Sequence, residues 1–127
     1  MHEQLLKYKA TYGLLVVSKI LATLPVVWVA LLYVMYFFSA IKLGHWPIAS
    51  LNDPKGFAFP VTVLRVAIWC VFYPMMFSFV LWPVSFLFIR RLRGYQKFYT
   101  RMFFIGCAFV LIQILLDPFS ILSWFLD

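Results

Sequence analysis

The first candidates for chemistry lie on one apolar segment, at Gly106, Val110, Gln113 and Asp117. Residues spaced i, i+4, i+7 and i+11 share one face of an α-helix. That face is small and polar in a segment otherwise rich in Phe, Ile, Leu and Val. Because a polar side chain facing lipid is costly, we expect this face to turn toward other helices.

A second charged residue, Arg65, lies near the start of another apolar segment, toward the same end of the molecule as Asp117. An Arg65–Asp117 pair is the preferred interhelical contact, and with Gln113 it would form an ion or substrate contact or a proton-linked gate. A purely structural explanation is favoured over this one. Asp followed by Pro118 also suits the N-cap and first position of a new helix, and an arginine at the end of a span can reach water.

The loop between the first two apolar segments carries the other acid–base candidates, His45, Asp53 and Lys55, together with Trp46. General acid–base catalysis by His45 and Asp53 would need a substrate group within hydrogen-bond reach. No nucleophilic residue accompanies them in a recognisable catalytic motif. Asp53 already suits the first position of a type I turn that continues with Pro-Lys-Gly, and Trp46 suits an interfacial anchor. An interfacial turn is therefore favoured over a catalytic site. The sequence indicates no metal site and no cofactor.

The composition identifies the solvent around these residues. The chain of 127 residues is 65% hydrophobic and only 12% charged, whereas a soluble domain is about half apolar and roughly a quarter charged. So little polar surface cannot cover an apolar core, and lipid must therefore be part of the solvent. The net charge of +7 does not indicate nucleic-acid binding, because the charges lie at the ends of apolar runs, where the positive-inside rule accounts for them.

Three apolar segments are long enough to span a bilayer, which takes about 20 residues. They cover residues 14–41, 61–89 and 96–116. Asp117-Pro118 then interrupts the pattern, and residues 118–126 are predicted to form a short interfacial helix. The alternative is one long helix kinked at Pro118. The expected fold is an all-α membrane protein, with a single integral membrane domain over residues 1–127.

Prolines and small residues indicate how the spans bend and pack. Three prolines lie within the first two spans and are expected to kink them: Pro25, Pro74 and Pro83. Membrane helices tolerate such kinks where neighbours satisfy the freed carbonyl. Ser18 and Ala22, one turn apart, would permit another helix to approach closely.

The basic stretch between the second and third spans predicts the orientation of the chain. It contains no acidic residue, and its cations are Arg90, Arg91, Arg93, Lys97 and Arg101. They outnumber Lys42, Lys55 and Arg65 at the other ends of the spans. The positive-inside rule then places this hairpin and the N-terminus in the cytoplasm, and the 43–60 loop and the C-terminus outside. The same cations could bind anionic lipid headgroups, although a topology determinant is the commoner role.

Two short loop segments, Gly44-His45-Trp46-Pro47 and Asp53-Pro54-Lys55, resemble those of a set of uncharacterised small multi-pass bacterial membrane proteins. These proteins carry a Gly-His/Arg-Trp-Pro segment and an Asp-Pro-Lys segment after their first span. The likeness covers the loop and its flanking helices. Residues 48–51, Ile-Ala-Ser-Leu, depart from the Asn-rich residues and further proline that members have there. The resemblance implies a bacterial inner membrane and no particular activity.

Three functions are compatible with the sequence. The favoured one is a small accessory or structural membrane protein that packs its helices against itself, as a homo-oligomer, or against a larger membrane subunit, because three spans enclose little interior. The alternative is a protomer of an oligomeric small-solute or ion transporter or channel lined by Gln113 and Asp117. A membrane-bound enzyme that uses the 43–60 loop is the least favoured hypothesis.

Overall fold

The computed structural model describes residues 1–48, 51–56, 59–90 and 97–127. No β-strand occurs in these ranges. The helices are α1 (His2–Leu43), α2 (Val61–Ile89), α3 (Lys97–Leu116) and α4 (Ile121–Leu126), with short 3₁₀ turns η1 (Pro54–Gly56) and η2 (Pro118–Ser120). By length and composition, α1, α2 and α3 can each cross a membrane. The prediction of an all-α membrane protein with three spans and a short C-terminal helix is confirmed.

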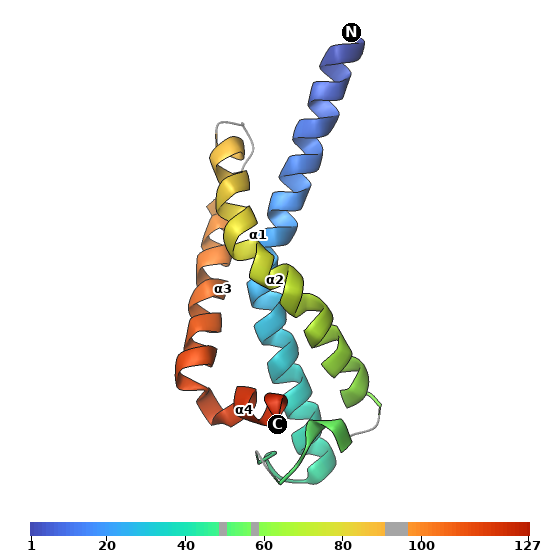
Figure 1. Cartoon of the computed structure of the whole chain (residues 1–127), viewed down its shortest axis with the longest axis vertical. Coiled ribbons are helices and arrows are strands. Elements are labelled where there is room, and N and C mark those ends of the chain that lie inside the picture. Colours follow the sequence, from blue (N-terminus) through green and yellow to red (C-terminus); the bar gives the residue numbers. More distant parts are fainter. Residues whose placement is uncertain (49–50, 57–58, 91–96) are drawn as a thin grey trace.

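The first helix is much longer than the predicted span of residues 14–41. α1 runs without a break for 42 residues from His2. At 1.5 Å per residue it is about 63 Å long, twice the apolar thickness of a bilayer. Residues 1–14 are exposed, and Figure 1 shows this part of α1 projecting beyond the other helices. A surface salt bridge joins Lys7 Nζ to Glu3 Oε1 at 3.0 Å, across one turn of this projecting part of α1.

α1 is the helix against which the other two spans pack (Figure 1). α2 and α3 also meet each other at one end, where the rings of Trp82 and Phe103 stack with centroids 4.1 Å apart. Toward the other end the two helices separate, and α4 turns back between α3 and α1 (Figure 1). α1 is therefore the centre of the bundle, and α2 and α3 form a splayed pair beside it.

Small residues permit the close contact of α1 and α2. Ser18 and Ala22 are fully buried, and the Ser85 hydroxyl of α2 donates to Ser18 Oγ at 3.3 Å. The close approach predicted from this small-residue pair is therefore observed. Both helices continue through their internal prolines without a break, and Figure 1 shows α2 curving along its length.

We call the end of the bundle formed by α4 and by the described residues between α1 and α2 (44–48, 51–56 and 59–60) the loop end. There, the Trp124 indole N–H of α4 donates to the carbonyl of Asn52. Lys55 Nζ donates to the backbone oxygen of Asp127 at 2.7 Å. Trp124 is fully buried. The loop and α4 are thereby fixed to each other, although they are far apart in the sequence.

Candidate functional site

The polar face that the sequence predicts on α3 is the face that packs against other helices. Gly106, Val110 and Gln113 are buried, and Gln113 is only 1% exposed. Asp117, which directly follows the helix, is half-buried. Because α3 packs on α1, this face lies in the interface between the two helices, as its spacing predicts.

Gly106 lies where the backbone of α3 comes very close to α1. A Cβ atom built on Gly106 would lie 2.9 Å from Pro25 Cβ and 2.9 Å from Val26 Cγ2 of α1, and 3.0 Å from Val26 N. Non-bonded carbon atoms normally sit about 3.5–4.0 Å apart. The contact between α3 and α1 therefore depends on the missing side chain at this position.

Gln113 connects α1 to the end of α3 through hydrogen bonds. The Tyr33 hydroxyl donates to Gln113 Oε1 at 3.2 Å, and Gln113 Nε2 donates to Asp117 Oδ1 at 2.9 Å. The amide thus uses both its acceptor and a donor inside the protein. Leaving a buried amide unpaired would cost about 1–3 kcal/mol, so these bonds explain how a glutamine can be buried in an apolar helix.

The carboxylate of Asp117 caps α4. Its Oδ1 accepts the N–H of Leu122 at 2.6 Å, and its Oδ2 accepts the N–H of Ser123 at 2.9 Å and the Ser123 hydroxyl. The first N–H groups of a helix have no acceptor within the helix itself, and the carboxylate supplies one. The sequence predicts Asp117 as the N-cap residue of a helix that begins at Pro118. The α-helix begins instead at Ile121, with Ser120 as its N-cap residue, and the Asp117 carboxylate caps it from three residues further back.

The reason for this offset is a left-handed backbone between α3 and α4. The φ angles of Asp117, Phe119 and Ser120 are 39°, 61° and 54°. Residues with a Cβ atom enter this region at a cost of roughly 1–2 kcal/mol each. The turn reverses the chain within the few residues of η2, and the Asp117 hydrogen bonds offset part of its cost.

The structure does not bring Arg65 to Asp117. Within the described residues no hydrogen bond or ion pair joins the two side chains. The Asp117 oxygens instead accept from Gln113 and from the start of α4. Arg65 is half-buried, and its Nε atom is buried without a hydrogen-bond partner among those residues. Arg65 is therefore a cation at the start of α2 that has no counterion among the residues that the structure describes.

We expect the substitutions Arg65→Gln and Asp117→Asn to act independently on stability. Residues without shared partners usually give additive effects to within about 0.5 kcal/mol. A double-mutant cycle, with the free energy of unfolding measured in lipid bicelles, tests this. A coupling energy above about 1 kcal/mol would show that the two side chains interact in the membrane-embedded protein.

The loop residues considered for acid–base chemistry are engaged separately. His45 is exposed, and its Nδ1 lies 2.9 Å from the carbonyl oxygen of Trp46. Asp53 Oδ1 accepts the Lys55 N–H at 2.7 Å, inside the turn that the sequence predicts. Trp46 stacks on Tyr36 of α1, with ring centroids 5.7 Å apart. In the described part of the loop no hydrogen bond joins His45 to Asp53.

The basic stretch is described only in part. Arg90, Lys97 and Arg101 are exposed, and Arg91 and Arg93 lie outside the described residues. The Nζ atom of Lys19 in α1 lies 5.3 Å from the ring centroid of Tyr99, which is near the start of α3. Four described cations therefore lie at the end of the bundle opposite the loop end.

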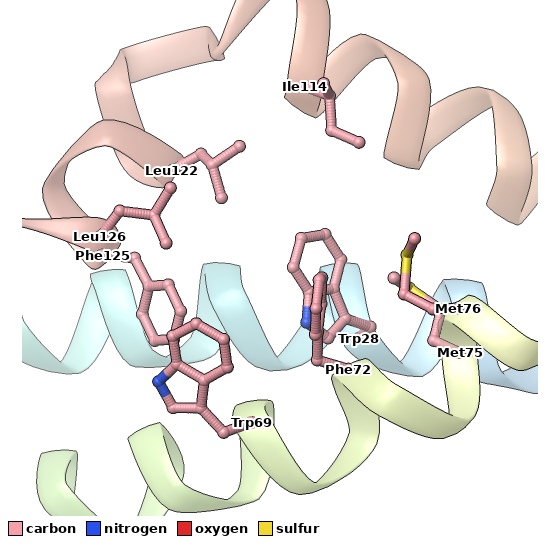
Figure 2. Close-up of a pocket in the computed structure, with 9 residues that line it drawn as sticks. All are labelled: Trp28, Trp69, Phe72, Met75, Met76, Ile114, Leu122, Phe125 and Leu126. Atoms are coloured by element: carbon pink, nitrogen blue, oxygen red, sulfur yellow. The ribbon is translucent and has the colours of Figure 1, made fainter.

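An apolar cavity, which the sequence does not predict, lies where α2 and α3 have separated. Its volume is about 260 Å³. All four helices contribute to its wall, and α4 closes it on the side of the loop end (Figure 2). Met76 and Ile114, which are 49% and 55% exposed, form part of the wall, so the cavity opens on the side of the bundle. The lining residues are Trp28, Trp69, Phe72, Met75, Met76, Ile114, Leu122, Phe125 and Leu126.

The sequence carries little signal for this cavity. Trp69, Phe72 and Met76 share one face of α2, but the neighbouring residues on the helix are apolar too. A cavity wall and a lipid-facing surface therefore have the same composition. The cavity exists because two helices diverge, which is a tertiary property.

Comparison with known proteins does not extend these assignments. No protein-family model, curated protein or solved structure matches the chain.

Proposed function

We propose that the protein is a small accessory or structural protein of a bacterial inner membrane, and that it acts by packing its helices against a second copy or a larger membrane subunit. The observation that carries this proposal is the internal use of the polar face on α3. Gln113 and Asp117 bond to Tyr33 and to α4, whereas a transport pathway would need them to face a lumen. The inner-membrane location is supported by the resemblance of the loop to bacterial membrane proteins.

The outward surface of the spans is the surface available for packing. Within the most apolar window of α1, α2 and α3, only 22%, 17% and 22% of the residues are buried. On α2, one exposed stripe follows helical spacing, which places its members on a single face. The stripe consists of Val66, Tyr73, Phe77, Val80 and Val84. Its Tyr and Phe side chains would bury a large apolar area against a partner helix.

The charges support an orientation with the basic end in the cytoplasm. Arg90, Lys97 and Arg101 are exposed at that end, and Lys and Arg are enriched in cytoplasmic segments. We infer that the N-terminus lies on the same side and that the loop end and the C-terminus face outward. Each exposed cation near the surface would also attract anionic lipid headgroups by about 1 kcal/mol.

Site-specific photo-crosslinking in native membranes tests the packing proposal. A photoreactive phenylalanine analogue at Phe77, which is 65% exposed on the stripe, is expected to give one discrete adduct with the mass of a dimer or of a single larger subunit. The matched control is Phe104, 61% exposed on α3 and outside the stripe, which should give lipid adducts. Lipid adducts alone at both positions would show that the proposal is wrong.

A further inference from the structure

The chemistry of the cavity matches a hydrocarbon chain. The cavity opens between helices that are long and apolar enough to cross a membrane, so lipid tails are its natural neighbours. A trapped water needs two or more polar partners, whereas an apolar cavity of roughly 150 Å³ stays dry and takes a small hydrocarbon. At about 260 Å³ with an apolar lining, this cavity can take part of an acyl chain.

Arg65 lies on the same face of α2 as the cavity wall, one turn nearer the loop end. Positions 65, 69, 72 and 76 are spaced i, i+4, i+7 and i+11, and the last three line the cavity. Figure 2 shows the side chains of Trp69, Phe72 and Met76 along this helix, with Phe125 of α4 beside Trp69. Arg65 therefore lies next to the cavity, on the side nearer the loop end.

The lack of a hydrogen-bond acceptor for Arg65 among the described residues suggests that its partner is an anion. Its Nε is buried and has no acceptor in the described part of the chain, and an unpaired donor on a charged group is costly. The side chain as a whole is only half-buried, so an anion can approach the guanidinium through its other N–H groups. A guanidinium binds phosphate through paired N–H groups, and it is the side chain best suited to that geometry. A phosphate with an attached hydrocarbon chain matches both Arg65 and the cavity.

We propose that the cavity binds one acyl chain of an anionic phospholipid, and that Arg65 binds the phosphate of the same molecule. Trp28, Phe72 and Met75 form the deep part of the chain site, and Met76 lies at its opening. Phe125 and Leu126 of α4 hold the chain near the headgroup. This site is distinct from the exposed cations at the other end of the bundle, and it does not depend on the packing function proposed above.

Native mass spectrometry of the full chain, released from nanodiscs of phosphatidylcholine with a minor fraction of phosphatidylglycerol, tests the headgroup. The wild type should retain one phosphatidylglycerol in preference to phosphatidylcholine. Arg65→Gln should lower this preference about five-fold, the effect of one cation on an anionic lipid. Arg101→Gln removes an exposed cation at the other end of the bundle and is the matched control. It weakens the general attraction of anionic headgroups to that end, but the single lipid that stays bound at Arg65 through release should be retained as in the wild type. Equal retention of both lipids by the wild type, or equal losses in the two variants, would overturn the proposal.

Filling the cavity tests the chain site. Ile114→Trp places a large ring in the cavity wall and should abolish retention of the lipid while Arg65 is intact. Leu115→Trp makes the same chemical change at the next residue, which is 76% exposed and not part of the wall, and should retain the lipid. Loss of the lipid in both variants, or in neither, would contradict a chain site in this cavity.

Tryptophan fluorescence gives a second readout that needs no cavity variant. Trp28 and Trp69 line the cavity, so phosphatidylglycerol with brominated chains should quench the wild type more than brominated phosphatidylcholine does. In Arg65→Gln the two lipids should quench equally. A wild type quenched equally by both lipids would contradict the proposal.

Discussion

The substitution Gly106→Val is expected to lower the free energy of unfolding by about 3 kcal/mol, the upper end of the range for overpacking a close-packed interface. The new side chain would begin 2.9 Å from Pro25 Cβ and 3.0 Å from Val26 N. A valine is a better helix former than glycine by a few tenths of a kcal/mol, which is too little to compensate. The Val26 N atom belongs to the backbone and cannot rotate away, so α3 must move off α1.

The measurement is reversible unfolding of the protein in lipid bicelles, followed by circular dichroism. The matched control is Ala108→Val, because Ala108 lies on the same helix with its side chain exposed. A surface change of this kind should alter stability by less than about 0.5 kcal/mol. If the two variants lose the same stability, crowding at the helix contact is not the cause, and the account of Gly106 is wrong.

The sequence predicts best where a composition boundary and a helix boundary coincide. The second span was predicted at residues 61–89, and α2 has the same bounds, because a proline precedes it and a basic run follows it. The first span was predicted at 14–41, whereas α1 covers His2–Leu43. Hydropathy identifies the part of a helix that crosses lipid. It does not show whether the helix ends at the membrane surface or continues into water.

The sequence predicts which helix face a candidate residue lies on better than it predicts which residue that side chain contacts. Spacing alone places Gly106, Val110 and Gln113 in an interface, because helical period fixes which side chains share a face. Opposite charge makes Arg65–Asp117 the preferred interhelical contact, although a capping role for Asp117 is favoured over that pair. In the structure Asp117 binds the N–H groups at the start of α4. Those groups come within reach only through the left-handed turn at Phe119 and Ser120, for which residues with a Cβ atom give no local signal.

Asp117→Ala is expected to undock α4 and to lower the free energy of unfolding by about 2–4 kcal/mol. Losing the cap of a helix costs about 0.5–2 kcal/mol, and the buried Gln113 amide that loses its acceptor adds about 1–3 kcal/mol. α4 has only six residues, too few to be stable without tertiary contacts. Hydrogen exchange should therefore become fast at the amides of 121–126 while α3 stays protected.

Ser123→Ala is the control for this substitution, because it removes a single hydroxyl donor to Asp117 and leaves both capped N–H groups in place. It should cost about 1 kcal/mol, the typical worth of one hydrogen bond, and leave the exchange of α4 slow. Because Leu122, Phe125 and Leu126 form the α4 part of the cavity wall, undocking of α4 in Asp117→Ala should also release the bound phospholipid. Slow exchange of 121–126 in Asp117→Ala would show that the contacts of Trp124 hold α4 without its cap, and that the carboxylate at 117 has another role.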